Sequence, residues 1–162
     1  RFWNIVDTDI PNEIRETWIY GNSTHTIDLL RFFGGKIKSF NSFSKSLREK
    51  NCDQFVAAMG FESGSLGSYT AHWYSPGGWS VTLYGNSVSV KFKPLEEGIW
   101  IDTNSAEHKI EPNEFDKKYK PGFYVQLKAF CSMLQKGTLE WPGQDLSGAS
   151  KTMELAQKFV DA

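Results

Sequence analysis

Cysteine is scarce in this sequence of 162 residues, and long apolar runs are missing. The two cysteines, Cys52 and Cys131, are far apart and match neither a disulfide framework nor a metal-binding spacing. We therefore expect reduced thiols, as is typical of a cytoplasmic protein. No apolar run approaches the roughly 18 residues that cross a membrane as a helix, so the sequence predicts no membrane span.

An excess of charge of either sign is also missing. Lysine and arginine total 18 against 19 aspartate and glutamate residues, which gives a net charge of −1. This balance offers no basic field for a nucleic acid or an anionic membrane surface. We expect neither as a partner.

Several motifs that bind cofactors or perform catalysis do not occur. The sequence has no G-x-G-x-x-G or G-x-x-x-x-G-K-[ST] phosphate-binding loop and no G-x-S-x-G nucleophile elbow. The three histidines, His25, His72 and His108, show no ligand spacing with Cys, Asp or Glu. We expect no metal and no cofactor-binding residue in this chain. Its first residues, RFWNIVDTD, lack an initiator Met, and we expect a piece of a longer polypeptide.

Aromatic residues, in contrast, are plentiful at 15% of the sequence, including six tryptophans. Because each aromatic side chain buries a large area, this content indicates a heavy core or a large interface. A sugar-stacking surface is the functional alternative, and composition alone leaves both open.

Apolar periodicity predicts one helix, about six strands and two further helices, in that order. The first helix, over 24–33, follows N-cap residues at 22–24 and ends at Gly34-Gly35. Strands are expected within 36–44, 53–61, 68–75, 78–85, 87–93 and 98–102, an irregular stretch over 103–121, and helices over 123–136 and from about 145 to 160. The last helix is expected to present Ala149, Met153, Ala156 and Val160 on one face.

Because the predicted strands follow one another and the predicted helices lie before and after them, the sequence predicts an α+β fold. We expect one large, mostly antiparallel sheet with helices packed on one face, in a single domain over 1–162. The other sheet face stays open for oligomerisation or domain contact.

The stretch GNSTHTIDLLRFFGG places His25 in the first turn of the first predicted helix. A histidine there lies at the positive end of the helix dipole, which favours the neutral imidazole. Since a neutral imidazole can accept a proton, His25 is the best catalytic candidate, with helix capping or packing as its alternative role. Asp28, one turn later, either contacts a ligand or stabilises the first turn.

The order of these motifs resembles a known family. GNSTHTIDLLRFFGGKIKSF is similar to the segment that opens the second domain of the glucose-fructose oxidoreductase / inositol dehydrogenase (Gfo/Idh/MocA) family. FESGSLGSYTAHWYSPGGWSVTLYG is similar to that family's sheet strands, and PGFYVQLKAFCSML and DLSGASKTMELAQKF are similar to its closing helices. The resemblance runs from about Trp18 to the C-terminus.

Members of this family are two-domain oxidoreductases that use NAD or NADP and act mostly on sugars, polyols and related alcohols. The resemblance implies that this chain is the C-terminal substrate-binding domain, that the nucleotide-binding domain lies upstream, and that the chain alone is inactive. It implies a sugar or polyol substrate and a homo-oligomer formed through the open sheet face.

The resemblance also assigns roles to residues. It implies that His25 is the acid/base at the reacting hydroxyl and that Gln126 matches a common family glutamine. Asn22 and Asp28 beside His25, and His72 on a polar strand face, are further substrate-binding candidates. That polar face could equally be an oligomer interface or simply face solvent.

The sequence departs from the family pattern at Gly21. Many members carry an aspartate four residues before the histidine, and Asn22 cannot replace an acid in proton transfer. Two alternatives therefore stay open. One is a non-catalytic carbohydrate-binding or protein-interaction module of the same fold, and the other is part of a nicotinamide-dependent glycosidase.

Overall fold

The computed structural model describes residues 10–162, which cluster into two compact units. The first unit holds the described residues up to 76 together with 146–162, and the second holds 77–145. That residues 1–162 act as one domain stays a prediction. The first unit contains α1 (Asn12–Glu16), the π-helix η1 (Ile19–Ser23), α2 (Thr24–Gly34), β1 (Ile37–Lys45), β2 (Gln54–Phe61), β3 (Leu66–His72) and α5 (Leu146–Val160). The second contains β4 (Val81–Gly85), β5 (Val88–Phe92), β6 (Gly98–Ile101), β7 (Glu107–Ile110), α3 (Glu114–Lys118) and α4 (Phe123–Lys136).

The strands and helices confirm the predicted α+β class. β1, β2 and β3 form a three-stranded antiparallel sheet, and β4 to β7 form a four-stranded antiparallel sheet. Residues 10–162 thus contain seven strands in two sheets, where the sequence predicts about six strands in one. The additional strand, β7, lies in the stretch expected to be irregular. Its sequence, EHKI, has one apolar residue, so pairing with β6 rather than its own apolar pattern defines it.

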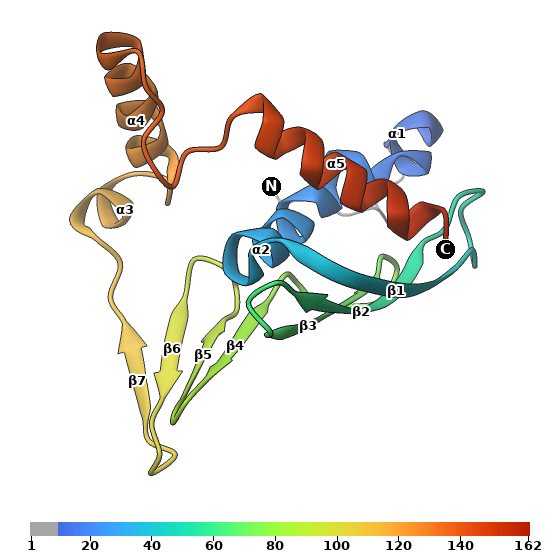
Figure 1. Ribbon diagram of the computed structural model, residues 1–162, viewed down its shortest axis with the longest axis horizontal. Coiled ribbons are helices and arrows are strands. Elements are labelled where there is room, and N and C mark those ends of the chain that lie inside the picture. The colour runs from blue at the N-terminus through green and yellow to red at the C-terminus, as the bar shows by residue number, and fades with distance from the viewer. Residues whose placement is uncertain (1–9) are drawn as a thin grey trace. The chain divides into compact units, whose positions relative to one another are not determined.

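In the first unit, α2 and α5 cover one face of the three-stranded sheet (Figure 1). The alternate β2 residues Phe55, Ala57, Met59 and Phe61 are all buried, as the two-residue period predicts. The Phe159 ring of α5 lies over them, with ring centroids 6.2 Å from Phe55 and 4.9 Å from Tyr69 of β3. This aromatic core holds both helices on the sheet.

The last helix, α5, buries a different face from the one predicted. Thr152, Leu155 and Phe159 are buried together with Ala156, whereas Met153 is 42% exposed. The buried face includes Thr152 because its hydroxyl donates a hydrogen bond to Asp28 Oδ1 of α2 at 2.5 Å. A polar side chain can lie on the buried face because its hydrogen bond is made there.

Helix α2 begins at Thr24, as the sequence predicts, but the expected N-cap does not form. Helix η1 runs directly into α2, and Ser23 has helical dihedral angles and makes no side-chain cap hydrogen bond. The free helix end therefore lies upstream of His25, and the expected placement of His25 at the positive end of the dipole is wrong. The other end agrees with the sequence, because Gly35 ends α2 at φ +83°.

The second unit consists of the four-stranded sheet and the helices α3 and α4. Cross-strand register places the side chains of Leu83, Val90 and Trp100 on one face of the sheet. Helices α3 and α4 contact each other through the rings of Phe115 and Tyr124, whose centroids are 4.2 Å apart. The apolar stripe that predicts α4 is exposed, and its members are Phe123, Leu127, Phe130 and Leu134.

Candidate functional site

His25 lies in the first turn of α2, and its side chain is exposed. The neighbouring Ser23 and Ile27 are 5% and 0% exposed, so their side of the helix faces the core. Two residues along a helix correspond to a rotation of about 200°. The His25 imidazole therefore points away from the three-stranded sheet.

Hydroxyl contacts hold this turn of α2 against β3. The Oγ1 atom of Thr26 donates to the carbonyl of Ser23 at 2.9 Å and lies 3.4 Å from the hydroxyl of Tyr69. Burial raises the pKa of Tyr69, and its hydrogen bonds with Thr26 and Ser23 offset part of that rise. The phenol stays protonated at neutral pH, so it supports the turn that carries His25 without adding a charge.

Asp28 contacts helix α5. Besides the hydrogen bond from Thr152, its Oδ1 lies 3.5 Å from Arg31 Nη1. Arg31 Nη1 in turn donates to Thr152 Oγ1 at 2.5 Å and to the carbonyl of Gly148 at 2.7 Å. Asp28 thus belongs to a polar link between α2 and α5, and its contact with a substrate stays a prediction.

Gly21 and Asn22 lie in the π-helix η1, immediately before α2. Asn22 is half-buried and Gly21 is exposed. A Cβ atom built on Gly21 would have nothing within 4 Å, so packing does not require a glycine there. The position at which the family resemblance implies an acid therefore has open space around it in this chain.

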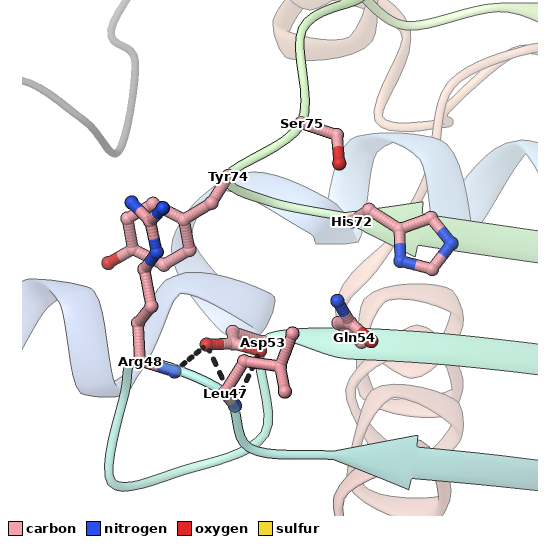
Figure 2. A pocket seen from close by; sticks show the side chains of 7 residues that line it. All are labelled: Leu47, Arg48, Asp53, Gln54, His72, Tyr74 and Ser75. Carbon is pink, nitrogen blue, oxygen red and sulfur yellow. Dashed lines mark hydrogen bonds between the residues drawn. The ribbon is translucent and has the colours of Figure 1, made fainter.

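His72, at the end of β3, lies on the opposite side of the sheet from α2. Because Tyr69 faces the helices, strand alternation turns Thr70 and His72 to the other face. His72 lines a hollow of about 160 Å³ together with Gln54, Tyr74 and Ser75 (Figure 2). A layer of helix and a layer of sheet separate His25 from His72, so the structure does not bring the two histidines into one site.

Gln126 is exposed on α4, in the second unit. Of the predicted site residues, only Asn22, His25 and Asp28 therefore share one segment, the continuous helical stretch over 19–34.

The sequence reading missed Asp53, which precedes β2 and is 1% exposed. Its carboxylate accepts hydrogen bonds from the backbone N–H groups of Leu47, Arg48 and Glu49, the shortest at 2.7 Å from Arg48. These bonds fold the loop between β1 and β2 into a tight turn beside the hollow (Figure 2). An aspartate between a polar stretch, SLREKN, and an apolar strand is the signal that could have identified it.

Over residues 10–162, no three His, Cys, Asp or Glu side chains gather closely enough to hold a metal ion. In the same range, no helix has the length and apolar character needed to cross a membrane.

Comparison with known proteins agrees with this architecture. Residues 11–91 match the family described as GFO/IDH/MocA C-terminal domain. The chain belongs to that family. The match includes His25, Asp28 and His72, whereas Gln126 of this GFO/IDH/MocA domain lies outside it. A search of curated proteins finds no match.

Three solved structures of the same fold are dehydrogenases about twice as long as this chain. A dehydrogenase from Chromobacterium violaceum aligns over 96% of this chain and 48% of its own, with a TM-score of 0.73 and 18% identity. Levoglucosan dehydrogenase in complex with NADH and L-sorbose aligns over 86% and 46%, with a TM-score of 0.72 and 14% identity. UDP-N-acetylglucosamine 3-dehydrogenase from Acidithiobacillus ferrooxidans aligns over 86% and 45%, with a TM-score of 0.71 and 9% identity. The GFO/IDH/MocA domain thus shares their fold and spans less than half of each.

Proposed function

We propose that this domain is the substrate-binding part of an NAD(P)-dependent oxidoreductase that acts on a sugar, polyol or related alcohol, with His25 as the proton acceptor. The family match over residues 11–91 carries the proposal. Dehydrogenase structures of the same fold support it, and two of them are named for carbohydrate substrates.

The sequence and helix α2 lack the features that bind the pyrophosphate of a dinucleotide in a nucleotide-binding domain. No G-x-G-x-x-G loop occurs, and the start of α2 continues from η1 instead of presenting free amide groups. We therefore assign no cofactor-binding residue to this chain. In the full-length protein, NAD or NADP would be held by another domain and would take up the hydride.

His25 has the properties that a proton acceptor at an alcohol needs. When a carbinol carbon loses a hydride, the hydroxyl proton has to leave as well, and an imidazole nitrogen can accept it. The His25 side chain is exposed to a ligand, and its helical turn is anchored through Ser23, Ile27 and Tyr69. A positioned acid/base group of this kind contributes about 10²–10⁴-fold to the rate.

Steady-state kinetics of the full-length protein test this role. His25→Ala should lower kcat by about 10²–10⁴-fold and remove one limb of the pH–rate profile, with little change in the melting temperature because the side chain is exposed. His108→Ala is the matched control, since His108 lies in the second unit and contacts Asp102. A His25→Ala enzyme with wild-type turnover would show that the acid/base assignment is wrong.

A titration of the 162-residue chain tests the absence of a nucleotide site. Fluorescence of NADH or NADPH should show no saturable change on addition of the chain. Micromolar binding would contradict the assignment of the cofactor to another domain.

Gly21 favours a second candidate, a non-catalytic carbohydrate-binding or protein-interaction module of the same fold. A protein that lost proton transfer would not need the acid that many relatives carry there. Gly21→Asp is a direct test because the added side chain has open space. If the full-length protein turns over no sugar or polyol with NAD or NADP, and Gly21→Asp and wild type are equally inactive, the second candidate holds.

We further propose that the open face of the three-stranded sheet contacts a second copy of the chain. Phe43 and Val56 lie opposite each other on that face, and Leu66, at its other end, is 87% exposed. Sedimentation should show self-association that Val56→Lys weakens, whereas Phe33→Lys on α2 leaves it unchanged. A monomer at high concentration would contradict this interface.

A further inference from the structure

The hollow beside His72 has a polar wall made by the start of β2, the end of β3 and the residues that follow β3. Register places Lys45 of β1 next to Gln54 of β2, and Gln54 next to His72 of β3, all on the face turned away from α2 and α5. Tyr74 and Ser75, which follow β3, close one side of the hollow (Figure 2). The end of the sheet therefore gathers side chains that donate hydrogen bonds.

Arg48 extends over this hollow from the loop between β1 and β2. Its guanidinium carbon lies 4.8 Å from the centre of the Tyr74 ring (Figure 2), an arrangement that holds a planar cation in place. Among residues 10–162, neither Arg48 nor Lys45 has a carboxylate within ion-pair distance. The lining of the hollow thus contains one cation, Arg48, whose charge the described residues do not pair, and Lys45 lies next to Gln54 on the adjoining strand.

The one carboxylate in the wall is not open to a ligand. Asp53 is 1% exposed, and the amides of Leu47, Arg48 and Glu49 donate to it. Its negative charge is therefore used to fix the loop that carries Arg48. The other polar side chains that line the hollow, among them Arg48, Gln54 and His72, can each donate a hydrogen bond.

We propose that this hollow binds a small oxyanion, a carboxylate or a phosphate, with Arg48 as the principal ligand and Gln54, His72 and Ser75 as further hydrogen-bonding partners. The guanidinium edge matches the paired oxygens of either group, and a volume of about 160 Å³ holds one such group. The site lies on the opposite side of the sheet from His25. It is therefore a second ligand site, independent of the proposed proton transfer.

Binding of inorganic phosphate and of acetate to the full 162-residue chain, followed by ¹⁵N NMR, tests the proposal and distinguishes the two chemistries. At least one probe should saturate below about 20 mM, with chemical-shift changes confined to residues 47–54 and 72–75. The probe that binds more tightly identifies the ligand class. Failure of both to saturate, or shifts spread over surface lysines, would overturn the proposal.

Three variants separate a specific site from a general positive field. Arg48→Gln should weaken binding about tenfold or more, because it removes a charge-assisted pair of hydrogen bonds. Arg48→Lys keeps the charge but loses the paired geometry and should weaken binding nearly as much. Lys38→Gln removes the same charge at the far end of β1 and should change the affinity less than twofold. Equal effects of Arg48→Gln and Lys38→Gln would refute the site, and Ser75→Ala gives an independent check should Arg48→Gln fold poorly.

Discussion

Replacing Gly34 with alanine should destabilise the protein, although alanine is the better helix former. Gly34 is the last residue of α2, and a Cβ atom built on it lies 2.5 Å from Phe61 Cε2 and closer still to Cζ and Cε1. Since carbon atoms in contact are normally about 3.5–4.0 Å apart, the ring or the helix end would have to move by about 1 Å or more. The ring has little freedom, because Phe61 is 5% exposed and a Cβ atom built on Gly67 would also lie only 2.9 Å from its Cε2 atom.

The expected magnitude follows from two opposing effects. Forcing an extra methyl group into a packed core costs about 1–3 kcal/mol. Replacing glycine with alanine inside a helix stabilises the helix by at most about 1 kcal/mol, and the gain is smaller at the last residue. We therefore expect Gly34→Ala to lower the free energy of unfolding by about 1–2 kcal/mol, measured by urea denaturation of the 162-residue chain.

Gly21→Ala is the matched control for this experiment. Gly21 is also helical, but its added Cβ meets nothing within 4 Å, so alanine there should stabilise the protein by about 0.5–1 kcal/mol. A double-mutant cycle with Phe61→Leu locates the clash, since the smaller side chain should remove part of the Gly34→Ala penalty. A Gly34→Ala protein as stable as wild type, or a cycle with no coupling, would refute the reasoning.

Three further predictions concern polar groups. Asp53→Ala should lower the free energy of unfolding by about 2–3 kcal/mol because three loop amides lose a charged acceptor, whereas the same change at the exposed Glu62 should cost far less in the same urea assay. Thr152→Val should lower the free energy of unfolding by about 1 kcal/mol. Thr152→Ser keeps the hydroxyl bonded to Asp28 and should lower it less. Equal losses of stability in the two variants would show that the hydroxyl is dispensable. His108 and the backbone amides of Ala106 and Asn104 lower the pKa of Asp102 below its ordinary 3.8. The folded state therefore favours the ionised form of Asp102. The stability that this carboxylate adds to the folded protein is complete above pH 3.8 and is lost as the pH falls through the lower pKa of the folded state. A carboxyl ¹³C NMR titration should give this lower value, and His108→Ala should return it toward 3.8; no change in that variant would contradict the assignment.

Local features of this protein follow from the sequence alone. The two-residue alternation from Phe55 to Phe61 identifies β2 and its buried face, because successive strand side chains point to opposite sides. Gly35 and Gly137 identify the ends of α2 and α4, because both adopt a positive φ that other residues avoid. The order of such signals predicts the α+β class, and the resemblance of the motifs to the Gfo/Idh/MocA family is confirmed by the match over residues 11–91.

The arrangement of the candidate sites depended on contacts between distant residues. Periodicity shows that a residue is buried but not what covers it, and so the predicted face of α5 missed Thr152, whose partner Asp28 is 124 residues away. The sequence predicts the first residue of α2 but not that η1 continues into it without a cap, because no apolar period marks the π-helix. Periodicity also cannot show that the two candidate residues His25 and His72 lie on opposite sides of the three-stranded sheet. Conversely, antiparallel pairing brings Lys45, Gln54 and His72 into one row beside Arg48, a neighbourhood that only the tertiary structure creates.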